Sequence, residues 1–275
     1  MSEGLFRLIV FGGSLAIVAA WEALAPDRPL RLPRLQRWLT HFGLGLLGMG
    51  LSRLLGASLT VGAALWAHGR GWGLLPHLGV LPLWAIPVSF LALDLAVYAQ
   101  HVATHAWKPL WRLHRVHHAD LDMDVSTGLR FHPIEILVSQ VYKATLVLLL
   151  GAPVLAVIAF ETALSLGSLF THANGRMPAS LERVLRGVVV TPTMHTLHHS
   201  TLSQETDSNF GFFLSCWDRL FRTYRATAEP GLVLGLKGVP DLGFGRLLAW
   251  PFRGSGLEIP GTWKSPADGT SRQAE

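Results

Sequence analysis

The chain has 275 residues, of which 50% are hydrophobic and only 15% are charged, and its mean hydropathy is +0.36. So little polar surface cannot coat a soluble globule, and the composition therefore excludes an ordinary soluble domain. The formal net charge of +5 does not indicate nucleic-acid binding, because the arginines gather beside apolar segments and no aromatic and basic binding module is present. The single cysteine, Cys216, excludes an intrachain disulfide and a cysteine-rich metal cage.

Apolar segments of membrane length follow one another along the first two thirds of the chain. We expect an all-α integral membrane protein whose four to five membrane helices or half-helices form a stem, drawn from residues 5–25, 42–67, 78–101, 134–150 and 153–171. The first segment should be retained rather than cleaved as a signal peptide, because Pro26 follows the best cleavage site. Arg53 falls inside the second segment, where an exposed charge is costly, so we expect it to face the bundle or a polar cavity.

The distribution of basic residues predicts the topology. The loop after the first segment carries one acid, Asp27, against four arginines, Arg28, Arg31, Arg34 and Arg37. Such a bias marks the cytoplasmic side of a membrane. Two membrane crossings later the chain should be back on that side, where Lys108, Arg112 and Arg115 form a second basic loop. We therefore predict a multi-pass protein with a cytoplasmic cap, in a bacterial inner membrane rather than the endoplasmic reticulum, and with residues 68–77 on the opposite side.

Histidines form three clusters in or beside the predicted cap, two of them with the pattern H-x-x-H-H. The clusters are His101 and His105, then His114, His117 and His118, and later His195, His198 and His199. Spacings of three and four residues put side chains on one face of a helix. His172 follows the last membrane segment directly and is a ninth candidate. Packing needs no imidazoles, whereas nine of them suit two metal ions with four or five nitrogen ligands each.

Local signals around the clusters indicate how they converge. Lys108-Pro109 should end one helix and begin another, because proline fits the first turn of a helix and not its interior. Beyond the second cluster, Val125 stands where a calcium loop needs glycine, and no glutamate occupies the twelfth position, so we reject calcium. We expect the three aspartates of this loop to face solvent or to hold it by local hydrogen bonds; they are Asp120, Asp122 and Asp124.

Several metalloprotein classes are excluded by what surrounds the histidines. No glutamate stands three residues before any histidine, which excludes the carboxylate-rich di-iron bundles. The sequence H-E-x-x-H of zinc proteases is absent. A bis-histidine haem would use only two ligands and leaves H-x-x-H-H unexplained. Imidazole suits iron, zinc, copper and nickel, so the residues alone leave the identity of the metal open.

A set of motifs between residues 81 and 225 resembles the fatty acid hydroxylase superfamily, the membrane di-iron proteins that include sterol desaturases and C-4 sterol methyl oxidases. The motifs are L-D-L-A-V-Y-A-Q-H-V-A-T-H (93–105), W-R-L-H-R-V-H-H (111–118), L-R-F-H-P-I-E (129–135), H-A-N (172–174), T-P-T-M-H-T-L-H-H (191–199), N-F-G (209–211) and W-D-R-L-F (217–221). One departure is Val102, where many relatives carry arginine.

The resemblance implies a membrane stem, a helical cytosolic cap and a dinuclear site. It implies oxidation of a C–H bond of a membrane lipid, a sterol or a fatty acyl or alkyl chain, by hydroxylation or desaturation with O₂ as co-substrate. The metals would be two iron ions, with zinc as a substitute in purified protein. Electrons would come from a separate ferredoxin, cytochrome or reductase, because the sequence has no flavin or nicotinamide fingerprint. The implied metal ligands are His101, His105, His114, His117, His118, His172, His195, His198 and His199.

Residues around the implied ligands are candidates for supporting roles. Four of them should accept the outer N–H of a ligating imidazole: Asp94, Asn174, Asp207 and Asp218. His132 is expected near these ligands or at the substrate mouth.

Two alternatives stay open for the function, a zinc-dependent hydrolase without redox turnover and an inactive relative. We predict membrane helices in residues 1–78, a catalytic domain in 79–225, an interfacial segment in 226–253 and a disordered tail in 254–275.

Overall fold

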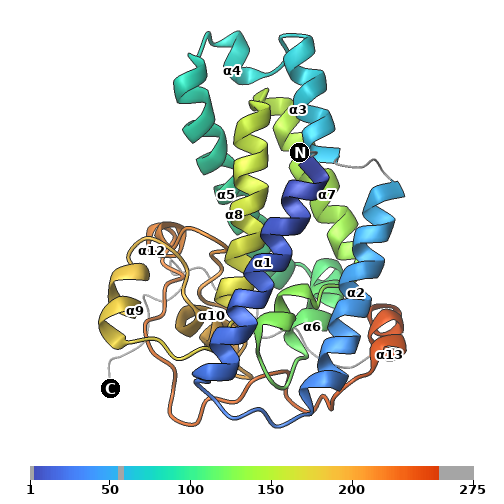
Figure 1. Cartoon of the computed structure of the whole chain (residues 1–275), viewed down its shortest axis with the longest axis vertical. Coiled ribbons are helices and arrows are strands. Elements are labelled where there is room, and N and C mark those ends of the chain that lie inside the picture. Colours follow the sequence, from blue (N-terminus) through green and yellow to red (C-terminus); the bar gives the residue numbers. More distant parts are fainter. Residues whose placement is uncertain (1–2, 55–58, 254–275) are drawn as a thin grey trace, which may run out of the picture.

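The computed structural model describes residues 3–54 and 59–253, and the predicted tail lies outside this range. In the described parts the chain forms helices and three isolated β-bridges, with no named strand. Figure 1 shows an upper stem and a lower cap. The stem helices are α1 (Glu3–Leu24), α2 (Arg34–Leu54), α3 (Leu59–Gly69), α4 (Leu74–His77), α5 (Pro82–Ala106), α7 (Pro133–Leu150) and α8 (Val154–Thr171). The cap elements are α6 (Lys108–His118), η1 (Val125–Leu129), α9 (Ala179–Leu185), α10 (Pro192–His198), α11 (Ser203–Thr206), α12 (Cys216–Leu220), α13 (Phe244–Ala249) and η2 (Trp250–Phe252).

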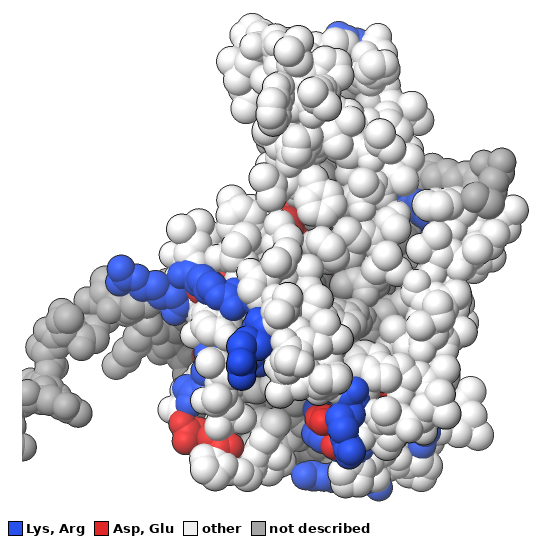
Figure 2. Space-filling model, turned by 60° about the vertical axis from the view of Figure 1, so that its left-hand side comes forward, with Lys and Arg blue, Asp and Glu red and all other residues white. Residues whose placement is uncertain are grey.

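Within the part of the chain that the structure describes, five segments are long and apolar enough to cross a membrane, which confirms the predicted all-helical stem. They are α1, the stretch from α2 to α4, and the single helices α5, α7 and α8. The face in Figure 2 agrees with this assignment, because charged side chains gather over its lower half while the upper half is almost uncharged. An uncharged surface is what contact with lipid requires.

The second predicted span differs from the structure. Residues 42–67 form parts of two helices, α2 and α3, on either side of residues 55–58. Arg53 is exposed near the end of α2, so the first of its two predicted settings, the interior of the bundle, is wrong. Hydropathy does not reveal this division, because it measures composition and not where one helix ends and the next begins.

The prolines of α5 and α6 set the bend at which stem and cap meet. Pro82 opens α5, and Pro87 lies inside it without ending it. The helix ends at Ala106, and Pro109 sits in the first turn of α6, as the sequence predicted. Because α5 and α6 are joined through Trp107 alone, the histidines at the end of one helix and along the other come to face the same interior.

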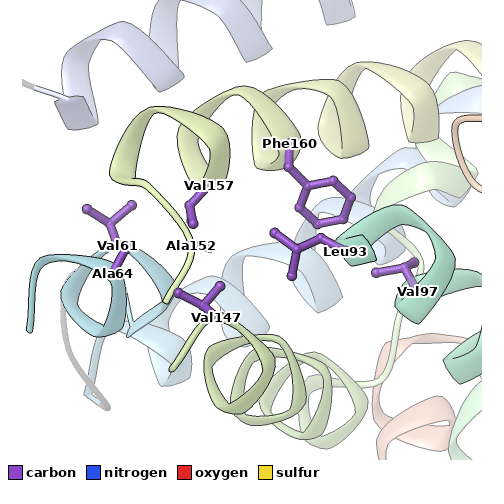
Figure 3. Packing of buried hydrophobic residues seen from close by; sticks show 8 residues of the cluster. All are labelled: Val61, Ala64, Leu93, Val97, Val147, Ala152, Val157 and Phe160. Carbon is purple, nitrogen blue, oxygen red and sulfur yellow. The ribbon is translucent and has the colours of Figure 1, made fainter. Parts of the chain in front are cut away.

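The core of the stem lies where α3, α5, α7 and α8 meet (Figure 3). Phe160 of α8 is its largest side chain, and the other members of this cluster are Val61, Ala64, Leu93, Val97, Val147, Ala152 and Val157. Nearby, Glu161 of α8 pairs with Arg7 of α1 and accepts a 2.7 Å hydrogen bond from Thr60 of α3. Lys143 of α7 lies 3.6 Å from the same carboxylate. Opposite charges inside the stem thus join four helices, as the cost of an unpaired charge there demands.

Candidate metal centre

Nine histidines from four helices converge between the stem and the cap. Helix α5 supplies one pair, α6 three, and the C-terminal cap of α8 one, while the last three lie on α10 and directly after it. Each side chain is at least 97% buried; they are His101, His105, His114, His117, His118, His172, His195, His198 and His199. These are the nine residues that the sequence pattern singled out.

The nine imidazoles divide into two groups, each able to hold a metal ion. The five-histidine group consists of His101, His105, His114, His118 and His198, and the four-histidine group of His117, His172, His195 and His199. Within each group the ligand atoms lie within 4.8 Å of one another. The groups are adjacent, since the rings of His118 and His199 stack at 4.5 Å across the boundary.

The spacing of the inner nitrogens fits metal coordination. The Nε2 atoms of His101 and His114 are 3.2 Å apart in the five-histidine group. In the other group, Nε2 of His172 lies 3.0 Å from that of His117 and 3.0 Å from that of His195. Two ligands bound at 2.0–2.1 Å to one ion, about 90–110° apart, are separated by roughly 2.8–3.4 Å. The observed separations match that value.

Unpartnered nitrogens support the same fit. Both ring nitrogens of His118 and of His199 are buried without a hydrogen-bond partner, and so is Nε2 of His105 and of His198. A buried polar atom without a partner is costly, so a cluster of them needs an explanation. A metal ion in each group would satisfy one nitrogen of each of these four rings.

The outer nitrogens of several imidazoles are held by the protein. Nδ1 of His101 donates to the Phe210 carbonyl at 2.7 Å, and Nδ1 of His198 to the Ser208 carbonyl at 2.8 Å. Nδ1 of His172 reaches the Ser168 carbonyl at 2.7 Å. These contacts fix the ring orientation and the tautomer, leaving Nε2 free to face a metal.

Two carboxylates perform the same task for two further imidazoles. Glu135 of α7 lies 2.6 Å from Nδ1 of His114, and Asp207 lies 3.3 Å from Nδ1 of His105. Burial raises the pKa of Asp207 to about 7. Asp207 was predicted from the sequence, whereas Glu135 was missed. Its position one helical turn after His132, in R-F-H-P-I-E, was the only signal for it.

The other predicted supporting residues have different partners. Asp94 accepts from the indole of Trp217 and the backbone of Leu214. His132 caps α7 and contacts the Leu248 carbonyl. Among the described residues Asp94 does not bond to an imidazole of the site, so its assignment is not supported, whereas a place for His132 at the substrate mouth stays a prediction.

Asp218 and Asn174 act on the backbone beside the site. Asp218 accepts from the backbone N–H of Phe210 and so acts on His101 only through that residue. Asn174 exchanges hydrogen bonds with the backbone of Arg28 instead of with an imidazole.

Burial lowers the pKa of six of the imidazoles and so favours their neutral form, which is the form that binds metal. It lowers the pKa of His172 to about 4, and nearby Asp120 and the Ser168 carbonyl oppose this only in part. Burial and then neighbouring imidazoles hold the pKa well below its ordinary value at five more positions: His117, His118, His195, His198 and His199.

The aspartates that follow α6 are part of a buried ion network. Arg37 of α2 donates to Asp120 at 2.8 Å and to Asp124 at 2.6 Å, and its side chain is 1% exposed. Burial opposes ionisation of Asp120, but His41 and Arg37 outweigh it and hold its pKa below the ordinary value. Asp124 also caps η1, as local bonding predicted. The expected solvent exposure is wrong, because the arginine assigned to the basic loop is buried against these acids.

Aromatic side chains line the histidine centre. The Phe131 ring stacks on His117 at 4.2 Å, and Phe212 lies 5.1 Å from His101. Trp111 lies 5.1 Å from His105. Apolar walls around neutral imidazoles exclude water and suit an apolar substrate.

Comparison with known proteins gives consistent matches. The profile of the fatty acid hydroxylase family matches residues 86–223. Ornithine lipid hydroxylase OlsE of Rhizobium tropici is 26% identical over 90% of this chain and 76% of its own length. Alkylglycerol monooxygenases of Homo sapiens and Danio rerio are 29% and 30% identical over 56% of the chain, which thereby spans only 33% of those relatives. No solved structure matches.

Proposed function

Because the chain belongs to the fatty acid hydroxylase family, we propose that it hydroxylates a C–H bond of a membrane lipid at a dinuclear iron centre. In this reaction a C–H bond becomes C–O–H. One oxygen atom of O₂ enters the lipid, and the other leaves as water after accepting two electrons and two protons. Hydroxylation is favoured over desaturation because the similar proteins are named as a hydroxylase and as monooxygenases.

The observation that carries this proposal is the division of nine buried imidazoles into groups of five and four. Activation of O₂ is the chemistry that two bound iron ions would supply. Glu135 and Asp207 would orient His114 and His105 by accepting hydrogen bonds from their outer N–H groups. The rings of Phe131 and Phe212 would hold an apolar chain near the metals and keep water out.

The membrane setting supports a lipid substrate and a separate electron donor. Five membrane-length segments hold the site at one end of the stem, where a lipid in the adjoining leaflet can reach it. We propose that a ferredoxin, cytochrome or reductase supplies the electrons. We also propose that the cap faces the cytoplasm of a bacterium, in line with the basic loop from Arg28 to Arg37 and with the relative in Rhizobium tropici.

Metal analysis together with oxygen uptake tests the proposal. Detergent-purified protein should contain close to two iron ions per chain, and with reductant it should consume O₂ in step with formation of a hydroxylated lipid. Lipids from cells with and without the gene would identify the product. Two zinc ions with lipid hydrolysis and no oxygen uptake would favour the hydrolase alternative. One ion per chain with all nine histidines intact would contradict the dinuclear centre.

A further inference from the structure

Glu22, near the end of α1, is fully buried although α1 lies on the outside of the stem. Its Oε1 accepts hydrogen bonds from the backbone N–H of Val125 and of Asn174, each at 2.7 Å. Val125 begins η1, just beyond the α6 histidines, and Asn174 follows His172 by two residues. One carboxylate oxygen therefore joins the chain after α6 to the chain after α8.

The chain that follows α1 continues along the same path. Its backbone donates from Asp27 to the Asn174 carbonyl at 2.9 Å, and Pro26 forms a β-bridge with Gly175. The Trp21 ring lies so close to Gly175 that an added Cβ would come within 2.3 Å of it. The end of α1 is thus fitted directly against the segment that carries His172.

Arg28 extends these contacts to a third histidine-bearing segment. Its Nη1 donates to the Thr196 hydroxyl at 3.2 Å, and its Nη2 to the Met123 carbonyl at 3.3 Å. Thr196 directly follows His195 on α10, and Met123 lies in the loop after α6. Residues 22–28 consequently bind all three segments that supply the four-histidine group.

We propose that Glu22 and Arg28 are positioning residues for the four-histidine group, an inference that rests on the proposed dinuclear centre. Most of these contacts fall on the segment after His172, whose single histidine belongs to the four-histidine group, whereas the α5 pair of the other group is held by Phe210 and Asp207. If one histidine is displaced, an ion in the four-histidine group would be left with three ligands, whereas an ion in the five-histidine group would be left with four. Both positioning residues precede the part of the chain that the family profile covers, residues 86–223.

Metal stoichiometry of the full chain in detergent tests this inference. Purified variants would be loaded with Zn²⁺, desalted and analysed for metal per monodisperse chain. Glu22→Leu and Arg28→Met should retain about one ion where the wild type retains two. Glu22→Gln keeps an oxygen that can accept both N–H groups, so it should retain two. Glu161→Leu removes the partner of Arg7 at the other end of α1, far from the histidines, and should also retain two.

The wild-type measurement separates the two proposals. Fewer than two ions in the wild type would overturn the dinuclear function itself. Two ions in the wild type and in both Glu22→Leu and Arg28→Met would overturn the positioning role alone. Loss of both ions from these variants would also overturn it, because the effect would not be confined to one group. If Glu22→Leu yields no monodisperse protein, Arg28→Met decides by the same criteria. Adding His199→Ala to either variant should remove no further ion.

Discussion

The hydrogen bond between His114 and Glu135 gives a direct test of how the outer nitrogens support the centre. The two atoms are 2.6 Å apart, and the residues are 1% and 8% exposed. Glu135→Leu leaves a buried N–H without an acceptor, at a cost of about 1–3 kcal/mol. Since about 1.4 kcal/mol corresponds to a factor of ten, we expect the affinity of the five-histidine group for metal to fall about 5–150-fold. Removal of outer partners at other metal sites has an effect of similar size.

Competition with a chelator of known affinity measures this change. Zinc-loaded wild type and Glu135→Leu would be titrated with the chelator, and retained metal would be determined after desalting. Only one of the two binding steps should weaken, because Glu135 contacts the five-histidine group alone. Glu135→Gln keeps an acceptor oxygen for His114 and should stay close to wild type. Equal affinities for Glu135→Leu and wild type would refute the reasoning, and equal losses for both variants would show that charge matters rather than the hydrogen bond.

Three further outcomes are expected. His198→Ala should abolish lipid oxidation without reducing the yield of protein extracted from the membrane. The control His77→Ala, at the exposed end of α4, should leave both oxidation and yield unchanged. Full product formation by His198→Ala would contradict its role as a ligand. Native Cys216, which is exposed, should react with an impermeant thiol reagent only from the cytoplasmic side, and Gly69→Cys in a chain lacking Cys216 only from the opposite side; the reverse pattern would invert the topology. Arg37→Met leaves two buried carboxylates without their partner and should lower the free energy of unfolding by about 3–5 kcal/mol, seen as a lower thermal midpoint; an unchanged midpoint would show that the network contributes little.

The sequence predicted the stem and the histidine centre because both depend on local regularities. Apolar runs report membrane helices, and i/i+4 spacing reports a shared helix face. His172 had no such pattern, but its place at the end of a membrane segment put it level with His101 and His105. The domain boundaries and the interfacial segment stay predictions, although residues 86–223 of the family match lie inside the predicted 79–225.

The supporting contacts could not be read from the sequence, for two physical reasons. Many acceptors of the outer imidazole protons are backbone carbonyls, as at Phe210 and Ser168, and any residue type can supply those. The buried charges meet only in the folded chain, since Arg37 and Asp120 are 83 residues apart. In the sequence Arg37 was counted among the basic residues that mark the cytoplasmic side. That interpretation gave no indication that its side chain is buried.

The division of each H-x-x-H-H pattern explains why the chain carries it twice. On α6 the i/i+4 pair His114 and His118 belongs to the five-histidine group, while His117 belongs to the other. At α10 the assignment is reversed, because the i/i+4 pair His195 and His199 lies in the four-histidine group and His198 in the five-histidine group. Adjacent residues on a helix point about 100° apart, so each motif contributes to both histidine groups at once. The proposed dinuclear centre would therefore arise from two copies of one local pattern used in opposite senses, and the pair from α5 and the single histidine from α8 would complete its two halves.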